Sequence, residues 1–233
     1  MKNKTLTEKR FFTGELTLNY AESPNRGHPL VMLHGGTDNW QTFKPILNEM
    51  AERYHLYLPD LRGHGLSDRA QSYWLKDEAS DIIQFITMIG KPVYLLGHSL
   101  GSLVALYVAA RMPETVIKLV IEDPPFFGTS DERFNQSNRR AVFMDKLQRI
   151  EKSPSADILA KQLQAQSGLS NIQSEHLARA YRQLDPNALR AFIERRNLSG
   201  YDYVNDLQQL RCPTLLLRAD PTVRSRPRRS LVD

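Results

Sequence analysis

Short, continuous apolar runs alternate with amphipathic segments along the first half of the chain. The runs lie at residues 30–33, 56–58, 93–96 and 116–121. A run without polar positions is typical of a strand buried on both faces, and the apolar spacing in between predicts helices over 40–53 and 75–89. A shorter alternation at residues 11–20 predicts an N-terminal hairpin. The whole pattern predicts an α/β fold with a mostly parallel sheet and helices on both faces.

The alternation stops after Ile121, and only helical spacing is found between about residues 130 and 200. Within this block, Asp185 followed by Pro186 is typical of the start of a helix. A strand pattern returns at residues 213–217, so the block is inserted between two strands and predicts a helical cap. We expect a core of residues 1–125 and 201–220, a cap over 126–200 and a basic, disordered tail over 221–233.

A Gly-x-Ser-x-Gly motif, Gly97-His98-Ser99-Leu100-Gly101, lies where the third apolar run meets an apolar helix pattern. Such a motif is typical of a nucleophile elbow, a sharp strand-to-helix turn that holds the serine hydroxyl above the sheet. Glycines flank the serine because strand and helix approach each other closely there. The start of the helix stabilises negative charge that develops near the hydroxyl. The motif therefore predicts nucleophilic catalysis by Ser99.

Two further motifs follow the two preceding apolar runs. His34-Gly35-Gly36 follows the first run, and a glycine-rich segment from Asp60 to Asp68 follows the second. Together with the elbow, these motifs resemble the α/β-hydrolase superfamily, in particular its esterase-like members with a helical cap. The resemblance covers about residues 9–220. It is specific for the fold and only weakly specific for the substrate.

The resemblance implies roles for several residues. Ser99 matches the family nucleophile, and the backbone N–H groups of Leu100 and Gly36 match the two donors of the oxyanion hole. His98 lies within the elbow and is expected to line the substrate site. Trp40 either lines the acyl pocket or packs at the start of a helix. The sequence has no clustered His, Cys or carboxylate ligands, so neither a metal nor another cofactor is implied.

The resemblance leaves two candidates for the acid of a catalytic triad. In many family members the acid follows the strand after the cap, in the pattern Gly-x-x-Asp; here Thr222 occupies that position and Asp220 lies two residues earlier. Other members place the acid after the strand before the cap, where this chain has Asp123 followed by two prolines. The prolines restrict the loop and favour Asp123 slightly. A turn or capping role is the alternative for each aspartate.

No histidine occupies the position near the C-terminus where the resemblance places the general base. The six histidines are His28, His34, His55, His64, His98 and His176. We expect His34 and His64 to have structural roles, and His176, in the cap, to face solvent. A serine without a base is a weak nucleophile at neutral pH, and loss of the serine or histidine of a comparable triad removes a factor of about 10⁶ in turnover.

We therefore expect this chain to be nearly inactive. Residues 221–233 have no strand or helix periodicity, and their Arg-, Pro- and Ser-rich composition differs abruptly from what precedes them. Our hypothesis at this point is that a frameshift or a premature stop has replaced the natural C-terminus.

The bulk composition is that of an ordinary globular protein, with 41% hydrophobic and 24% charged residues in a chain of 233 residues. This length suffices for one domain with a small insertion. The single cysteine, Cys212, excludes an internal disulfide and suits a reducing compartment. The chain has no signal-peptide pattern and no apolar run long enough to span a membrane, so we expect a cytoplasmic protein.

The net charge of +5 does not indicate a nucleic-acid-binding protein. Four arginines and one aspartate lie between Pro221 and Asp233, so more than half of the net charge falls in this short segment. A tail of this kind binds phosphates weakly and without sequence preference. We expect a small-molecule acyl substrate as the partner, and neither a specific nucleic acid nor a membrane; the sequence leaves the oligomeric state open.

The motifs predict a serine hydrolase that cleaves a carboxylic ester, a thioester or a related small acyl substrate through an acyl-enzyme on Ser99. Serine at the elbow argues against dehalogenase and epoxide-hydrolase chemistry, for which members of the superfamily use aspartate there. Perhydrolase and C–C bond hydrolase activities stay open, since both share the serine elbow. The alternative from another class is a non-catalytic protein that binds its ligand in the same pocket. The missing base favours this alternative, and the intact elbow disfavours it.

Overall fold

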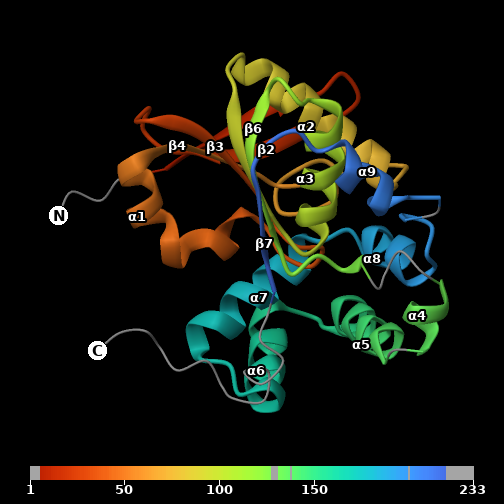
Figure 1. The fold of residues 1–233 in the computed structure, drawn as a ribbon. Coiled ribbons are helices and arrows are strands. Elements are labelled where there is room, and N and C mark those ends of the chain that lie inside the picture. The colour runs from red at the N-terminus through yellow and green to blue at the C-terminus, as the bar shows by residue number, and fades with distance from the viewer. Residues whose placement is uncertain (1–5, 127–130, 137, 199, 219–233) are drawn as a thin grey trace.

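A seven-stranded, mostly parallel sheet forms the centre of the protein (Figure 1). The structure, a computed structural model, describes residues 6–126, 131–136, 138–198 and 200–218. In their order across the sheet, the strands are β1 (Thr7–Phe12), β2 (Thr17–Glu22), β4 (Tyr54–Pro59), β3 (His28–Leu33), β5 (Val93–His98), β6 (Val116–Glu122) and β7 (Thr214–Leu217). The hairpin of β1 and β2 is antiparallel, as is the pairing of β2 with β4, whereas all pairings from β4 to β7 are parallel.

Alternate residues of β3 contribute to two separate cores, one on each face of the sheet. Val31 and Leu33 belong to the core that also contains residues of β5, β6, α2 and α3. Leu30 and Met32 belong to the core beneath α1. All four side chains are buried. This continuous apolar run is therefore a strand covered on both faces, as its sequence predicts.

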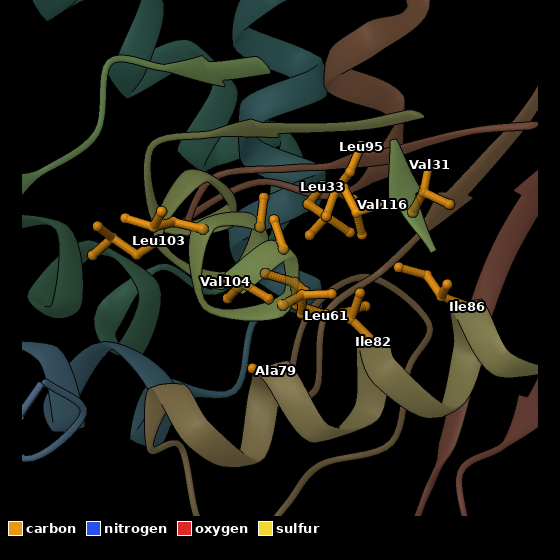
Figure 2. Close-up of a cluster of buried hydrophobic side chains, with 14 of the residues drawn as sticks. Val31, Leu33, Leu61, Ala79, Ile82, Ile86, Leu95, Leu103, Val104 and Val116 are labelled. Carbon is orange, nitrogen blue, oxygen red and sulfur yellow. The ribbon is translucent and has the colours of Figure 1, made fainter. Parts of the chain in front are cut away.

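Helices cover both faces of the sheet, so the predicted fold class is confirmed. The elements that do so are η1, a 3₁₀ helix (Trp40–Phe43), α1 (Lys44–Arg53), α2 (Leu75–Ile89), α3 (Leu100–Arg111) and α9 (Tyr203–Gln209). α1 and η1 pack on one face, and α2 and α3 pack on the other. Figure 2 shows Ile82 and Ile86 of α2 directed toward the strands that carry Val31 and Leu33, with Val104 of α3 in the same cluster.

In the described part of the chain between β6 and α9, five helices form a block. They are α4 (Asp131–Gln136), α5 (Arg139–Lys152), α6 (Ala156–Ser167), α7 (Asn171–Gln183) and α8 (Pro186–Ile193). Four of them, α5 to α8, share a hydrophobic core separate from those of the sheet. Leu147 of α5, Leu159 of α6 and Tyr181 of α7 meet in this core. In Figure 1 the block lies below the sheet, beside the end of β7. Helices thus fill the stretch predicted to be a cap; we call them the cap helices below.

The exact division into core and cap domains stays a prediction, and the predicted basic tail over 221–233 lies outside the described residues. Within the described part of the chain, no helix combines the length and the apolar character needed to cross a membrane.

Candidate active site

Ser99 occupies a strained turn between β5 and α3. Its backbone angles are φ 51° and ψ −115°, a combination that residues with a side chain rarely adopt. Hydrogen bonds hold the backbone on both sides: the Ser99 N–H donates to the carbonyl oxygen of Glu122 at 2.9 Å, and the Ser102 N–H donates to the carbonyl oxygen of Ser99 at 3.0 Å. The surrounding structure thus fixes the serine in the turn that its motif predicts.

The two glycines of the motif allow strand and helix to approach closely. A β-carbon built on Gly97 would lie 2.1 Å from the carbonyl oxygen of Gly101. A β-carbon built on Gly101 would lie 2.4 Å from the carbonyl oxygen of Leu33. Both distances are far inside van der Waals contact, so only glycine fits at either position.

The segment after β3, residues 34–39, packs directly against the elbow; we call it the oxyanion loop. The Gly101 N–H donates to the carbonyl oxygen of His34 at 3.2 Å. A β-carbon built on Gly36 would lie 3.2 Å from Cδ2 of Leu100, and one built on Gly35 would lie 3.3 Å from the β-carbon of Ser99. The structure therefore brings together Gly36, Leu100 and Ser99, the two predicted oxyanion donors and the predicted nucleophile.

His34 supports the oxyanion loop from below. The ring is fully buried, Nε2 lies 2.9 Å from the Leu61 N–H, and Nδ1 lies 2.8 Å from the carbonyl oxygen of Gly35. Since Nε2 accepts a hydrogen bond, the proton of the neutral ring belongs on Nδ1. Burial, with a smaller contribution from the neighbouring His64, lowers the pKa of His34 to about 3. A neutral, doubly bonded ring fits the structural role that the sequence analysis gave this residue.

Three consecutive residues of the oxyanion loop are bound by the cap helices. Lys146 of α5 donates to the Thr37 hydroxyl at 3.5 Å, His176 of α7 lies 2.9 Å from Asp38 Oδ1, and the Asn39 side-chain amide donates to Gln183 of α7 at 3.0 Å. Burial raises the pKa of Asp38, but the hydrogen bond and charge of His176 outweigh burial and hold that pKa below its usual value. The expectation that His176 faces solvent is wrong, because its ring, a quarter exposed, binds this carboxylate.

Asp123 directly follows β6, the neighbour of β5 in the sheet. Its φ of 44° is in the left-handed region, and its N–H donates to the carbonyl oxygen of Leu217 at 2.8 Å. This turn brings Asp123 to the wall of the cavity that Ser99 lines. Asp220, the other predicted candidate for the acid, lies outside the described residues.

A cavity of about 670 Å³ lies over the elbow. The oxyanion loop from Gly35 to Asp38 and the elbow from His98 to Leu100 form one part of its wall, and the segment from Asp123 to Phe126 forms another. The cap helices close the opposite side, with three residues of α5 and three of α8. These are Arg139, Phe143, Lys146, Ala188, Leu189 and Phe192. The cavity is therefore shared between the sheet and the cap helices.

The two residues predicted to bind substrate lie in different places. His98 lines the cavity. A β-carbon built on Gly35 would lie 3.1 Å from Nδ1 of His98. Trp40 is not among the cavity-lining residues; it is buried in the core beneath α1, and its indole N–H donates to Glu8 at 2.8 Å. Of the two alternatives that the sequence left open for Trp40, packing at the start of a helix describes its position.

No histidine is hydrogen-bonded to the Ser99 hydroxyl, although all six lie in the described part of the chain. His64 and His98 line the cavity. The ring nitrogens of His64 face the backbone carbonyl oxygens of Arg62 and Gly36, at 2.8 and 3.2 Å, and burial lowers the pKa of this ring. Across the described residues, no group of three or more His, Cys, Asp or Glu side chains is arranged to hold a metal ion.

Sequence analysis missed Arg139 and Lys146, which line the cavity from α5. A signal was present: Arg139, Phe143 and Lys146 are spaced by four and three residues and so share one face of a helix. The pattern could predict the shared face, but nothing in the sequence says that this face meets the oxyanion loop.

A model of the alpha/beta hydrolase family matches residues 30–232. The chain belongs to this family. Among solved structures, that of the N-formylmaleamic acid deformylase from Pseudomonas putida S16 covers 91% of this chain and 82% of that chain, with a TM-score of 0.77 and 20% sequence identity. The structure of E-2-(acetamidomethylene)succinate hydrolase covers 91% and 80%, with a TM-score of 0.73 and 22% identity. At these identities, the two structures bear out the α/β-hydrolase fold.

Sequence comparison of this α/β hydrolase with curated proteins finds named hydrolases. The 2-(acetamidomethylene)succinate hydrolase of Mesorhizobium japonicum is 34% identical over 124 residues, which are 52% of this chain and 44% of that protein. Epoxide hydrolase 4 of Mus musculus is 29% identical over 76% of this chain and 52% of its own length. The N-formylmaleamate deformylase of Pseudomonas putida is 26% identical over 86% of this chain and 73% of its own length. The chain thus spans about half the length of the first two relatives.

Proposed function

We propose that this α/β hydrolase cleaves a carboxylic ester or a related small acyl compound through an acyl-enzyme on Ser99. The observation that carries the proposal is the placement of Ser99. This residue lies in a strained turn next to Gly36 and Leu100, and it lines a cavity that the cap helices cover. A strained serine persists only where its surroundings hold it, and such positions are common at catalytic sites. Serine, rather than aspartate, at this turn favours acyl transfer over the epoxide chemistry for which one relative is named.

In the proposed reaction, Ser99 Oγ attacks the substrate carbonyl carbon and forms a new C–O bond. The carbonyl electron pair moves to oxygen, and the N–H groups of Gly36 and Leu100 donate to this oxyanion. When the carbonyl re-forms, the bond to the leaving group breaks, and the leaving group takes the proton that a base has removed from the serine. Water then cleaves the acyl-enzyme in the same way. Loss of one oxyanion donor typically costs about 3–4 kcal/mol of transition-state stabilisation.

Of the two candidate acids, we propose Asp123. It follows the strand next to β5, lines the cavity and is held in a left-handed turn by a backbone hydrogen bond to β7. An acid in this position would orient a histidine that takes the serine proton. None of the six histidines of the 233-residue chain bonds Ser99, so we expect this chain by itself to turn over slowly.

The names of two relatives widen the range of acyl substrates to test. One is a deformylase and the other is a hydrolase of an acetamidomethylene compound, so N-acyl compounds belong beside esters in a substrate screen. The alternative function is ligand binding without turnover. The absence of a histidine at Ser99 favours that alternative, whereas the strained serine disfavours it, because a binding protein does not need such a turn.

The proposal is tested by intact mass spectrometry of the purified chain before and after treatment with a fluorophosphonate, which labels activated serines. We expect one adduct per chain, formed slowly, because the hydroxyl lacks a base. Imidazole added to the solution should accelerate labelling, since it can supply the missing base from outside.

Two variants make the result specific. Ser99→Ala should abolish the adduct with and without imidazole, whereas Ser80→Ala, at an exposed serine of α2, should leave it unchanged. If the chain forms no adduct even with imidazole, or if Ser99→Ala still forms it, the serine-hydrolase proposal fails and ligand binding without turnover becomes the better account.

A further inference from the structure

The cavity wall opposite the nucleophile elbow carries two cationic side chains on one face of α5. Arg139, Phe143 and Lys146 line the cavity at helical spacing, so a guanidinium and an ammonium flank one aromatic ring. Like charges on one face of a helix repel each other, and the nearby Arg139 is one cause that lowers the pKa of Lys146. Burial is the larger cause of that lowering.

The Lys146 ammonium is poorly satisfied by the protein itself. Among the described residues its hydrogen-bond partner is the Thr37 hydroxyl, at 3.5 Å, and no carboxylate forms an ion pair with it. An ammonium has three donors, so one long hydrogen bond leaves two of them for another acceptor. The charge of Asp38 favours the protonated form of Lys146, and the ammonium lies 5.3 Å from the centre of the Phe143 ring, but burial outweighs these contributions and lowers the pKa of Lys146.

Among the described residues, none of the carboxyl groups that line the cavity, those of Asp38, Glu78 and Asp123, forms an ion pair with Lys146. Asp38 accepts from His176 and from the Asn39 N–H, both at 2.9 Å. Glu78 is almost fully buried, and burial raises its pKa to about 8, so at neutral pH it is mostly uncharged. A carboxylate of a molecule bound in the cavity would therefore give Lys146 the direct ionic partner that these groups do not provide.

We infer that the acyl substrate of this protein carries a carboxylate, which Lys146 binds while the scissile carbonyl lies at Ser99. The inference rests on the proposed function and deepens it by naming the substrate class. Thr37 directly follows Gly36, so the ammonium that binds Thr37 lies beside the predicted oxyanion donor. This proximity favours a short organic acid, in which few bonds separate the carboxylate from the reacting carbonyl.

Binding of a non-hydrolysed series of small acids tests the inference without any need for turnover. The series is succinate, succinamate and succinamide, which have the same carbon skeleton and two, one and no carboxylates. Calorimetric titrations are made with the Ser99→Ala protein. We expect succinate to bind most tightly, and succinamide most weakly. Lys146→Met should weaken succinate binding about 10- to 100-fold, the usual effect of losing a charge-assisted hydrogen bond, and leave succinamide binding unchanged.

Two further variants separate a site from a general charge effect. Lys161→Met removes an exposed lysine from α6, outside the cavity, and should leave all three affinities unchanged. Lys146→Arg keeps the charge and should retain most of the affinity for succinate. The inference is wrong if Lys146→Met binds succinate like its parent, if Lys161→Met weakens binding equally, or if the parent binds none of the acids.

These outcomes are independent of the test of the proposed function. Labelling of Ser99 reports on the nucleophile, whereas the titrations use a chain without that hydroxyl. Equal melting temperatures of the Lys146→Met and Lys161→Met proteins exclude misfolding as the cause of lost binding. Labelling of Ser99 without carboxylate binding would leave a serine hydrolase of neutral substrates, and the reverse would leave a protein that binds acids without cleaving them.

Discussion

The backbone of Ser99 and the glycines beside it form the part of the site that the sequence predicts most directly. The motif requires a sharp turn and small flanking residues, and the structure has a φ of 51° at Ser99 with glycines at closest approach. Short-range sterics decide these features, so a local pattern is sufficient to predict them. For Trp40, by contrast, no local pattern decides between lining the acyl pocket and packing at the start of a helix.

Gly101→Ala should destabilise the protein by about 3 kcal/mol, because the new methyl group would lie 2.4 Å from the carbonyl oxygen of Leu33. Urea unfolding followed by circular dichroism measures the change. Gly168→Ala is the matched control. Gly168 has a φ of 61°, but a β-carbon built on it would contact no atom within 4 Å, so backbone strain alone should cost about 1 kcal/mol. Equal losses in the two variants would mean that the close approach at the elbow does not limit the side chain.

Glu78 makes stability depend on pH in a predictable direction. Burial raises its pKa from 4.5 to about 8, so the folded protein holds a proton that the unfolded chain releases above about pH 4.5. The folded state binds more protons in this window, and the free energy of unfolding therefore falls as pH rises from about 4.5 to 8. Above about pH 8 the folded protein has to bury the charged carboxylate of Glu78, and this burial lowers the free energy of unfolding.

Glu78→Gln should remove this fall and make the protein more stable than its parent by a few kcal/mol at pH 8, with little difference near pH 4.5. Urea unfolding of both proteins across this range provides the measurement. Glu114→Gln, at an exposed glutamate, should leave the pH profile unchanged. A parallel displacement of the Glu78→Gln profile at all pH values would contradict a titration at this site.

At the level of helices and strands, periodicity predicted most of the elements that surround the site. The helix over 75–89 has the predicted bounds in α2, and the apolar runs lie within β3, β4, β5 and β6. Residues 40–53 are predicted as one helix, but η1 precedes α1 there, and Pro45 lies in the first turn of α1, where its missing N–H costs nothing. α4, α6 and α9 have weak or short apolar patterns, so periodicity alone does not define them as separate helices.

The junction of α7 and α8 is tied to the core by a buried hydrogen bond. The Tyr73 hydroxyl donates to Asp185 Oδ2 at 2.7 Å, and Asp185 also caps α8 by accepting from the Asn187 N–H at 2.9 Å. Tyr73→Phe leaves the buried carboxylate with fewer donors and should lower the free energy of unfolding by about 1–3 kcal/mol.

The change is measured by thermal unfolding against Tyr94→Phe, since no described residue bonds the Tyr94 hydroxyl. That control should melt like the parent. If both variants melt alike, the bond from Tyr73 to Asp185 does not hold the cap helices to the core.

At the level of the whole molecule, the sheet order explains why residues far apart in sequence meet in one site. β3 lies between β4 and β5, and β6 is next to β5. The carboxyl ends of these parallel strands therefore lie along one edge, which carries the oxyanion loop, the elbow and Asp123. The sequence predicts each of these motifs separately. Their distances and their contacts with α5 and α7 depend on long-range packing, which one sequence without an alignment does not encode in a visible pattern.

The three bonds from the cap helices to Thr37, Asp38 and Asn39 bear on any attempt to redesign this protein. One way to alter the substrate preference would be to graft a cap from another protein onto an unchanged sheet. Here a graft would also remove the side chains that hold the loop next to Gly36, and with them the support of the predicted oxyanion donor. The cap and the oxyanion loop are therefore not interchangeable parts, and a successful exchange would have to carry residues 36–39 with the cap.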